Sequence, residues 1–81
     1  MVRTTFSGRE IISVLRDFDY RPVSRTESHV RLRYEHPETG EVRNVDVPMH
    51  KEVKIGTVRS IADQCGAADF EAWCQWIDEH S

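Results

Sequence analysis

The spacing of apolar residues along the 81-residue chain changes from helical to alternating and back to helical, and this predicts the order of its elements. The first periodic segment predicts a helix from about residue 8 to residue 18. Ser7 and Glu10 have the spacing of a capping box at its start, and Asp19 should end it. The helix has one apolar face, formed by Ile11, Val14, Leu15 and Phe18.

Three segments with strand patterns follow this helix. Residues 20–25 predict a short strand, which Pro22 places at the edge of a sheet. Residues 29–35 alternate, so that Val30, Leu32 and Tyr34 should point into the core while His29, Arg31, Arg33 and Glu35 point away from it. Residues 36–40 have turn composition. Residues 42–47 predict the returning strand, which Pro48 stops, with two expected core residues, Val45 and Val47.

Two further helical patterns complete the chain. Thr57 is expected to cap the second helix, and Gly66 to end it. Asp69 is expected to cap the third, which repeats apolar residues at Phe70, Trp73, Cys74 and Ile77. We therefore predict an α+β fold with the order αβββα(α), a three-stranded antiparallel sheet and one sheet face packed by helices. A chain of this length has one core, so residues 1–81 should form a single domain.

Composition excludes several classes of protein. No apolar run approaches the ~20 residues of a membrane span, and the N-terminus has no export segment, so we expect a cytoplasmic protein without membrane contact. Cys65 and Cys74 match no zinc spacing and are expected to be buried, reduced thiols. The sequence has no glycine-rich phosphate loop and no metal-ligand spacing of histidines and acids. We therefore expect no metal and no small-molecule cofactor.

The net charge of −3 argues at first against a nucleic-acid partner. The distribution of the charges weakens this argument, because all eleven Lys and Arg precede residue 60 whereas five of the fourteen acids follow it. A basic-leaning body with an acidic last helix can present a local positive face to phosphates. The alternative is that these charges only solvate the surface.

His29 is the leading candidate for chemistry. A neutral imidazole can take the proton from a ribose 2′-hydroxyl, and the ordinary histidine pKa of about 6.5 suits this task. Arg31 and Arg33 would hold the adjacent phosphate. Taken alone, a histidine that opens a strand is more often structural. Ser28 precedes His29 on an extended chain, so the two side chains are expected to point apart and not to form a nucleophile–base pair.

Ser28-His29 and a second block resemble the HicA family of small toxins that cleave messenger RNA. The second block has the family's residues at the family's spacing: Pro48, His50, Lys51, Glu52, Gly56, Thr57, Arg59 and Ile61. The resemblance covers essentially the whole chain. It implies a fold related to double-stranded-RNA-binding domains, a metal-independent endoribonuclease activity with His29 as its essential residue, and a HicB-like antitoxin as partner.

The resemblance also suggests which other residues contact RNA. We expect phosphate or backbone contacts from Ser28, Arg31, Arg33, His50, Lys51, Lys54 and Arg59. His50 has three possible roles: it binds the RNA backbone, it donates a proton to the leaving oxygen, or it only supports the turn geometry. His36 lies in a turn and His80 at the C-terminus, and both are interpreted as structural or solvated.

Two residues depart from the family pattern. Glu27 stands where glycine usually precedes Ser-His, and Asp19 where glycine commonly closes the first helix. A carboxylate beside His29 would raise its pKa or repel phosphates, so a weakened or inactive copy is one alternative. A non-catalytic RNA-binding module of the same fold is a second alternative. A protein-interaction domain without an RNA role is a third.

Overall fold

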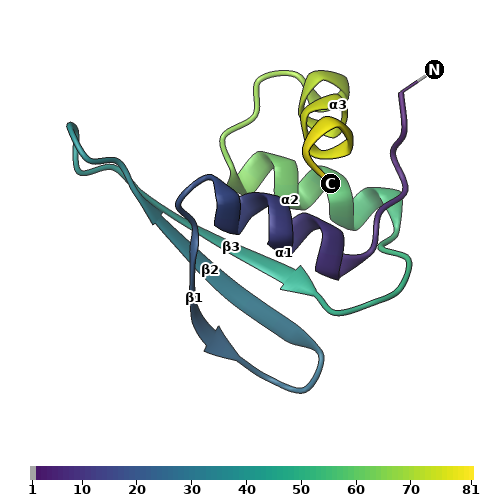
Figure 1. Cartoon of the computed structure of the whole chain (residues 1–81), viewed down its shortest axis with the longest axis horizontal. Coiled ribbons are helices and arrows are strands. Elements are labelled where there is room, and N and C mark those ends of the chain that lie inside the picture. Colours follow the sequence, from purple (N-terminus) through teal and green to yellow (C-terminus); the bar gives the residue numbers. More distant parts are fainter. Residues whose placement is uncertain (1) are drawn as a thin grey trace.

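The elements follow the predicted order in the computed structural model, which describes residues 2–81. They are α1 (Gly8–Asp17), β1 (Arg21–Arg25), β2 (His29–Glu35), β3 (Val42–Pro48), α2 (Ile55–Gln64) and α3 (Phe70–His80). The strands form one antiparallel sheet in the order β1-β2-β3. Figure 1 shows the helices gathered on the β3 side, with β1 farthest from them. The predicted α+β fold is confirmed.

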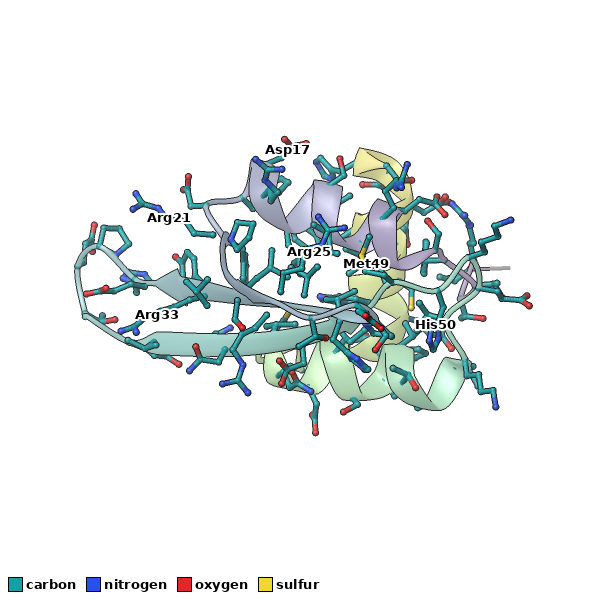
Figure 2. All side chains as sticks on the ribbon, turned by 90° about the horizontal axis from the view of Figure 1, so that it is seen from below. Asp17, Arg21, Arg25, Arg33, Met49 and His50 are labelled. Atoms are coloured by element: carbon teal, nitrogen blue, oxygen red, sulfur yellow. The ribbon has the colours of Figure 1, made fainter. Side chains whose placement is uncertain are left out.

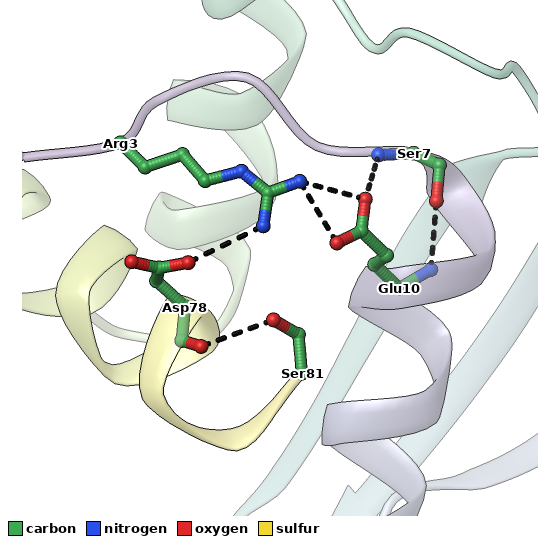
Figure 3. Close-up of polar contacts among 5 residues, drawn as sticks. All are labelled: Arg3, Ser7, Glu10, Asp78 and Ser81. Atoms are coloured by element: carbon green, nitrogen blue, oxygen red, sulfur yellow. Dashed lines mark hydrogen bonds and ion pairs between the residues drawn. The ribbon is translucent and has the colours of Figure 1, made fainter.

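The predicted capping box starts α1 and also ties the N-terminal segment to α3 (Figure 3). The Glu10 backbone N–H donates to Ser7 Oγ at 3.0 Å, and the Ser7 N–H donates to Glu10 Oε1 at 3.0 Å. Arg3 donates to both oxygens of Glu10, at 2.9 and 2.8 Å, and to Asp78 Oδ1 of α3 at 3.3 Å. The Ser7 N–H, followed by Arg3, lowers the pKa of the Glu10 carboxyl. One arginine thus joins the first and last helices.

The sheet has one buried and one open face, as the alternation predicts. Val30, Leu32, Val45 and Val47 are buried against the helices, and Tyr34 is half-buried. His29, Arg31, Arg33 and Glu35 are exposed on the opposite face. The core between sheet and helices also includes Phe6, Ile11, Val14, Leu15, Val53, Val58, Ile61, Trp73, Cys74 and Ile77. Because the helices cover only one side, the open face is free to meet a ligand.

Strand β1 is an edge strand, as Pro22 predicts, and all five of its residues are exposed. Its register with β2 shifts between Pro22 and Ser24, so Val23 is an extra, bulged residue. A bulge, a proline and flanking arginines are features that protect an edge against pairing with further strands. The other edge strand, β3, lies beside α2, and the Asp46 N–H donates to Gln64 Oε1 at 2.9 Å.

The predicted cap of α2 is wrong. The helix begins at Ile55, its N-cap is Lys54 without a side-chain hydrogen bond, and Thr57 lies inside the first turn. A tertiary contact sets this start. Val53 is buried and forms an isolated β-bridge with Phe6, in which the Val53 N–H donates to the Phe6 carbonyl at 2.8 Å. Fixing Val53 makes the chain turn directly after it, three residues earlier than a threonine cap would allow.

The remaining helix ends agree with the sequence. Asp69 Oδ1 accepts from the Ala72 N–H at 3.1 Å and caps α3. Asp19, with φ 73°, and Gly66, with φ 78°, follow α1 and α2 in the left-handed conformation that ends helices. The two cysteines are buried free thiols, and burial raises the pKa of each. In residues 2–81, none of the helices has the length and apolarity to cross a membrane.

Gly8 lies in close contact with the end of β3. Its N–H donates to the His50 carbonyl at 2.9 Å, and a Cβ at this position would collide with the Pro48 carbonyl oxygen. The contact leaves no room for a side chain. It therefore fixes the end of β3 and the segment after it against the first turn of α1.

We expect Gly8→Ala to destabilise the fold by about 1–3 kcal/mol, because the added methyl forces the α1 start away from β3. Gly56→Ala is the matched control, since a Cβ there meets nothing within 4 Å. It should leave stability unchanged or raise it by up to about 1 kcal/mol. Urea unfolding of both variants measures the difference, and equal midpoints would contradict the close contact.

Candidate active site

His29 is the first residue of β2, and its side chain is exposed on the open face. The turn before it holds its backbone from both sides. The His29 N–H donates to Thr26 Oγ1 at 3.1 Å, and the His29 carbonyl accepts from the Thr26 N–H at 2.9 Å. The position of the imidazole therefore depends on a closed turn as well as on the strand.

The expectation that Ser28 and His29 point apart is wrong. Ser28 Oγ lies 3.0 Å from His29 Nδ1, because Ser28 belongs to the bend before β2 and not to the extended strand. When Nδ1–H donates to the serine oxygen, Nε2 keeps its lone pair and can accept a proton. Ser28 is thus placed to select a tautomer of His29, which is a positioning role.

The chain segment that contains His50 lies beside Ser28 and His29. Pro48 is the cross-strand partner of His29, and the Met49 N–H donates to the Ser28 carbonyl at 2.7 Å. His50 follows with an exposed side chain, while its carbonyl accepts from Gly8. Figure 2 shows Met49 and His50 toward one end of the molecule and Arg33 toward the other. The structure therefore brings the two predicted histidine segments together.

Arg31, the next residue on the open face of β2, is paired with a carboxylate. Its Nε and Nη2 donate to Asp46 Oδ1 and Oδ2 at 3.0 and 3.2 Å, and the two residues are direct partners across β2 and β3. The hydrogen bond from Arg31 lowers the pKa of Asp46, and charge on the nearby His29 acts in the same direction. Arg31 keeps further N–H donors for a phosphate, although its charge is already compensated.

The other predicted RNA contacts are spread over the surface. Arg33 lies four residues along β2 from His29, or about 13 Å at strand spacing. Lys51 and Lys54 are exposed between β3 and α2, on the same segment as His50. Arg59 places its guanidinium 4.3 Å from the centroid of the Phe70 ring, at the contact of α2 with α3. Only Lys51 and Lys54 thus share a chain segment with His50.

Sequence reasoning missed Asp46 and Thr26. Asp46 lies between the core residues Val45 and Val47, so its place on the open face follows from alternation. Its pairing with Arg31 follows only once the register of β2 and β3 is known. Thr26 acts through a turn whose geometry the sequence does not give. In residues 2–81, no group of three or more His, Cys, Asp or Glu side chains is arranged to hold a metal ion.

Comparison of the sequence with models of protein families gives a match that includes these segments. The model of the HicA toxin of bacterial toxin–antitoxin systems matches residues 8–67. The chain belongs to the HicA toxin family. The match runs from the first residue of α1 past the end of α2, so it includes Ser28-His29 and the segment from Pro48 to Ile61. No curated protein and no solved structure matches the chain. Membership assigns it to the toxins of toxin–antitoxin pairs, and so implies an antitoxin partner.

The Arg31–Asp46 pair predicts that part of the stability of this HicA toxin is lost at acid pH. The pKa of Asp46 is lower in the fold than in the unfolded chain, so its contribution is present above the unfolded value and lost as pH falls through the folded one. Asp46→Asn should therefore lower the melting temperature at pH 6, and the deficit should disappear near pH 2–3.

Thermal unfolding by circular dichroism between pH 2.5 and pH 6 measures this difference. Glu35→Gln is the control, because Glu35 lies on the same face without an ion pair among residues 2–81. A deficit for Asp46→Asn that stayed constant with pH would mean that its carboxylate charge contributes nothing.

Proposed function

We propose that this HicA toxin is an endoribonuclease that cleaves messenger RNA and thereby blocks translation, with His29 as its general base. The observation that carries the proposal is an exposed histidine, hydrogen-bonded through Nδ1, inside the segment that matches the family. Its side chain is exposed on the face of the sheet that no helix covers. A single-stranded RNA can reach such a face without any rearrangement of the core.

The proposed reaction is a transesterification within the RNA. His29 Nε2 takes the proton of a ribose 2′-hydroxyl, and the 2′-oxygen attacks the neighbouring phosphorus. A bond from phosphorus to the 2′-oxygen forms as the bond to the 5′-oxygen breaks, which gives a 2′,3′-cyclic phosphate and a 5′-hydroxyl. Ser28 Oγ accepts from Nδ1–H and stabilises the imidazolium that results. The remaining donors of Arg31 can contact the negative charge on the phosphate.

The leaving 5′-oxygen needs a proton, and His50 is the group we assign to supply it. It lies two residues beyond Pro48, the cross-strand partner of His29, and the Gly8 N–H holds its backbone. The exposed Lys51 and Lys54 on the same segment would bind flanking phosphates. Arg59 would extend this basic surface along α2.

The partner we propose is a HicB-like antitoxin that covers the open face around His29. An exposed face with a reactive histidine and several arginines has to be shielded while the toxin is stored. Because messenger RNA is translated in the cytoplasm, we place the toxin and its antitoxin there. Coverage of His29 would prevent RNA from entering, without any change in the toxin fold.

We expect His29→Ala to lower the cleavage rate of a messenger RNA fragment by about 10²–10⁴-fold, the usual contribution of general acid–base catalysis. Induced expression of the wild type should arrest growth with loss of transcripts, and expression of the variant should not. Gel analysis of purified protein with labelled RNA gives the rate. His80→Gln is the matched control, since this histidine lies at the end of α3, where its Nδ1 is hydrogen-bonded to the Trp76 carbonyl.

The outcome separates the proposed enzyme from a non-catalytic RNA-binding module. If the folded wild type binds RNA but cleaves none, the ribonuclease proposal is wrong and the binding module replaces it. If wild type and His29→Ala cleave at equal rates, another residue is the base.

The assignment of His50 predicts a dependence on the leaving group. His50→Gln should slow cleavage of ordinary RNA by about 10²-fold, because no acid protonates the 5′-oxygen. It should leave cleavage almost unchanged where a 5′-sulfur replaces that oxygen, since a thiolate leaves without a proton. Single-turnover rates on both substrates measure the difference. Equal slowing would instead assign His50 to substrate binding.

A further inference from the structure

Two arginines form an unpaired cationic site at the end of the sheet opposite His29. Arg21 of β1 and Arg33 of β2 are direct cross-strand partners, so their side chains leave the same face side by side. Both are exposed. None of the four ion pairs among residues 2–81 includes either of them. Like charges placed directly opposite each other destabilise a sheet, so the pair costs stability unless an anion lies between them.

The surroundings of this pair form a groove. It has a volume of about 600 Å³ and lies between the start of β1 and the turn that joins β2 to β3, with Val23, Tyr34 and Pro37 among its lining residues. The turn is held by hydrogen bonds from the His36 N–H to the Glu41 carbonyl at 2.8 Å and from the Gly40 N–H to the His36 carbonyl at 2.9 Å. Asp19 and Glu35 also line the groove. These carboxylates limit attraction to the part of the groove that Arg21 and Arg33 line.

The Arg21–Arg33 pair differs from Arg31, the other arginine of the open face, in the residues that lie opposite it. Asp46 lies directly opposite Arg31 and takes two of its donors, whereas Arg33 has Asn44 on its β3 side and Arg21 on its β1 side. Both partners of Arg33 lack a negative charge. Two planar guanidinium groups on adjacent strands supply the donors that a phosphate requires.

We propose that Arg21 and Arg33 bind a backbone phosphate of the RNA substrate, several nucleotides from the bond that His29 cleaves. The inference rests on the proposed ribonuclease function. It adds a second place, away from His29, at which the protein holds the RNA. The distance of about 13 Å along β2 corresponds to about four nucleotides of a stacked strand, and to fewer in an extended one. The RNA therefore lies along β2, with its reacting phosphate at one end of the strand and its anchored phosphate at the other.

The test measures RNA binding in a His29→Ala background, so that no cleavage occurs. Arg21→Ala/Arg33→Ala should weaken binding of a 12-nucleotide single strand at least about tenfold at low salt. The slope of log K against log[salt] should become shallower by about 0.7, because the pair contacts one phosphate and each neutralised phosphate contributes about 0.7 for single strands. Fluorescence anisotropy between 50 and 300 mM salt gives both values.

Arg9→Ala/Arg16→Ala is the charge-matched control, since both arginines are exposed on α1 and the pair removes the same charge. Its salt slope should stay that of the parent. Equal losses of RNA affinity in both double variants would overturn the site, because they would show a general charge effect. An unchanged salt slope in Arg21→Ala/Arg33→Ala would overturn it too. If the His29→Ala parent binds no RNA at all, the proposed function fails, and this anchor fails with it. Melting temperatures confirm that the variants are folded.

Discussion

The contact on which the site depends is the junction of α1, β2 and β3 at Gly8. A glycine is required there because the Pro48 carbonyl occupies the place of a side chain, and the Gly8 N–H holds the His50 carbonyl at 2.9 Å. On the other side of the same segment, Met49 donates to Ser28 at 2.7 Å. The start of α1, the bend before β2 and the segment after β3 are distant in sequence and thus meet at this junction. The junction brings the two segments that carry the candidate histidines beside each other.

Local charge on the open face depends on strand register more than on composition. The chain is acidic overall, yet all of its Lys and Arg lie in the first 59 residues, whereas five of its fourteen acids follow residue 60. Within the sheet, register pairs Arg31 with Asp46 and leaves Arg33 beside Arg21 and Asn44. Among residues 2–81, the open face therefore has one arginine in an ion pair, Arg31, and two arginines outside any ion pair, Arg21 and Arg33. Net charge alone would not distinguish this from a uniformly solvated surface.

The sequence predicts most of the fold, because alternation and helical spacing are local signals. Val30, Leu32, Val45 and Val47 are buried where the period of two places them, and the Ser7–Glu10 box starts α1. The errors arise where distant contacts decide. Pairing of Val53 with Phe6 starts α2 before Thr57, and the bend at Ser28 turns its hydroxyl toward His29. Asp46 and Arg21 could be assigned to the site only after the register was known.

The bulge at Val23 decides whether Arg25 lies opposite His29. Before it, Arg21 and Pro22 pair with Arg33 and Leu32, and an unbroken register would continue until Arg25 stood opposite His29. The extra residue instead places Arg25 opposite the buried Val30 and Ser24 opposite Arg31. Since a one-residue slip moves side chains to the other face, Arg25 leaves the face of the imidazole. The bulge therefore protects an exposed edge and also keeps Arg25 off the face on which His29 lies.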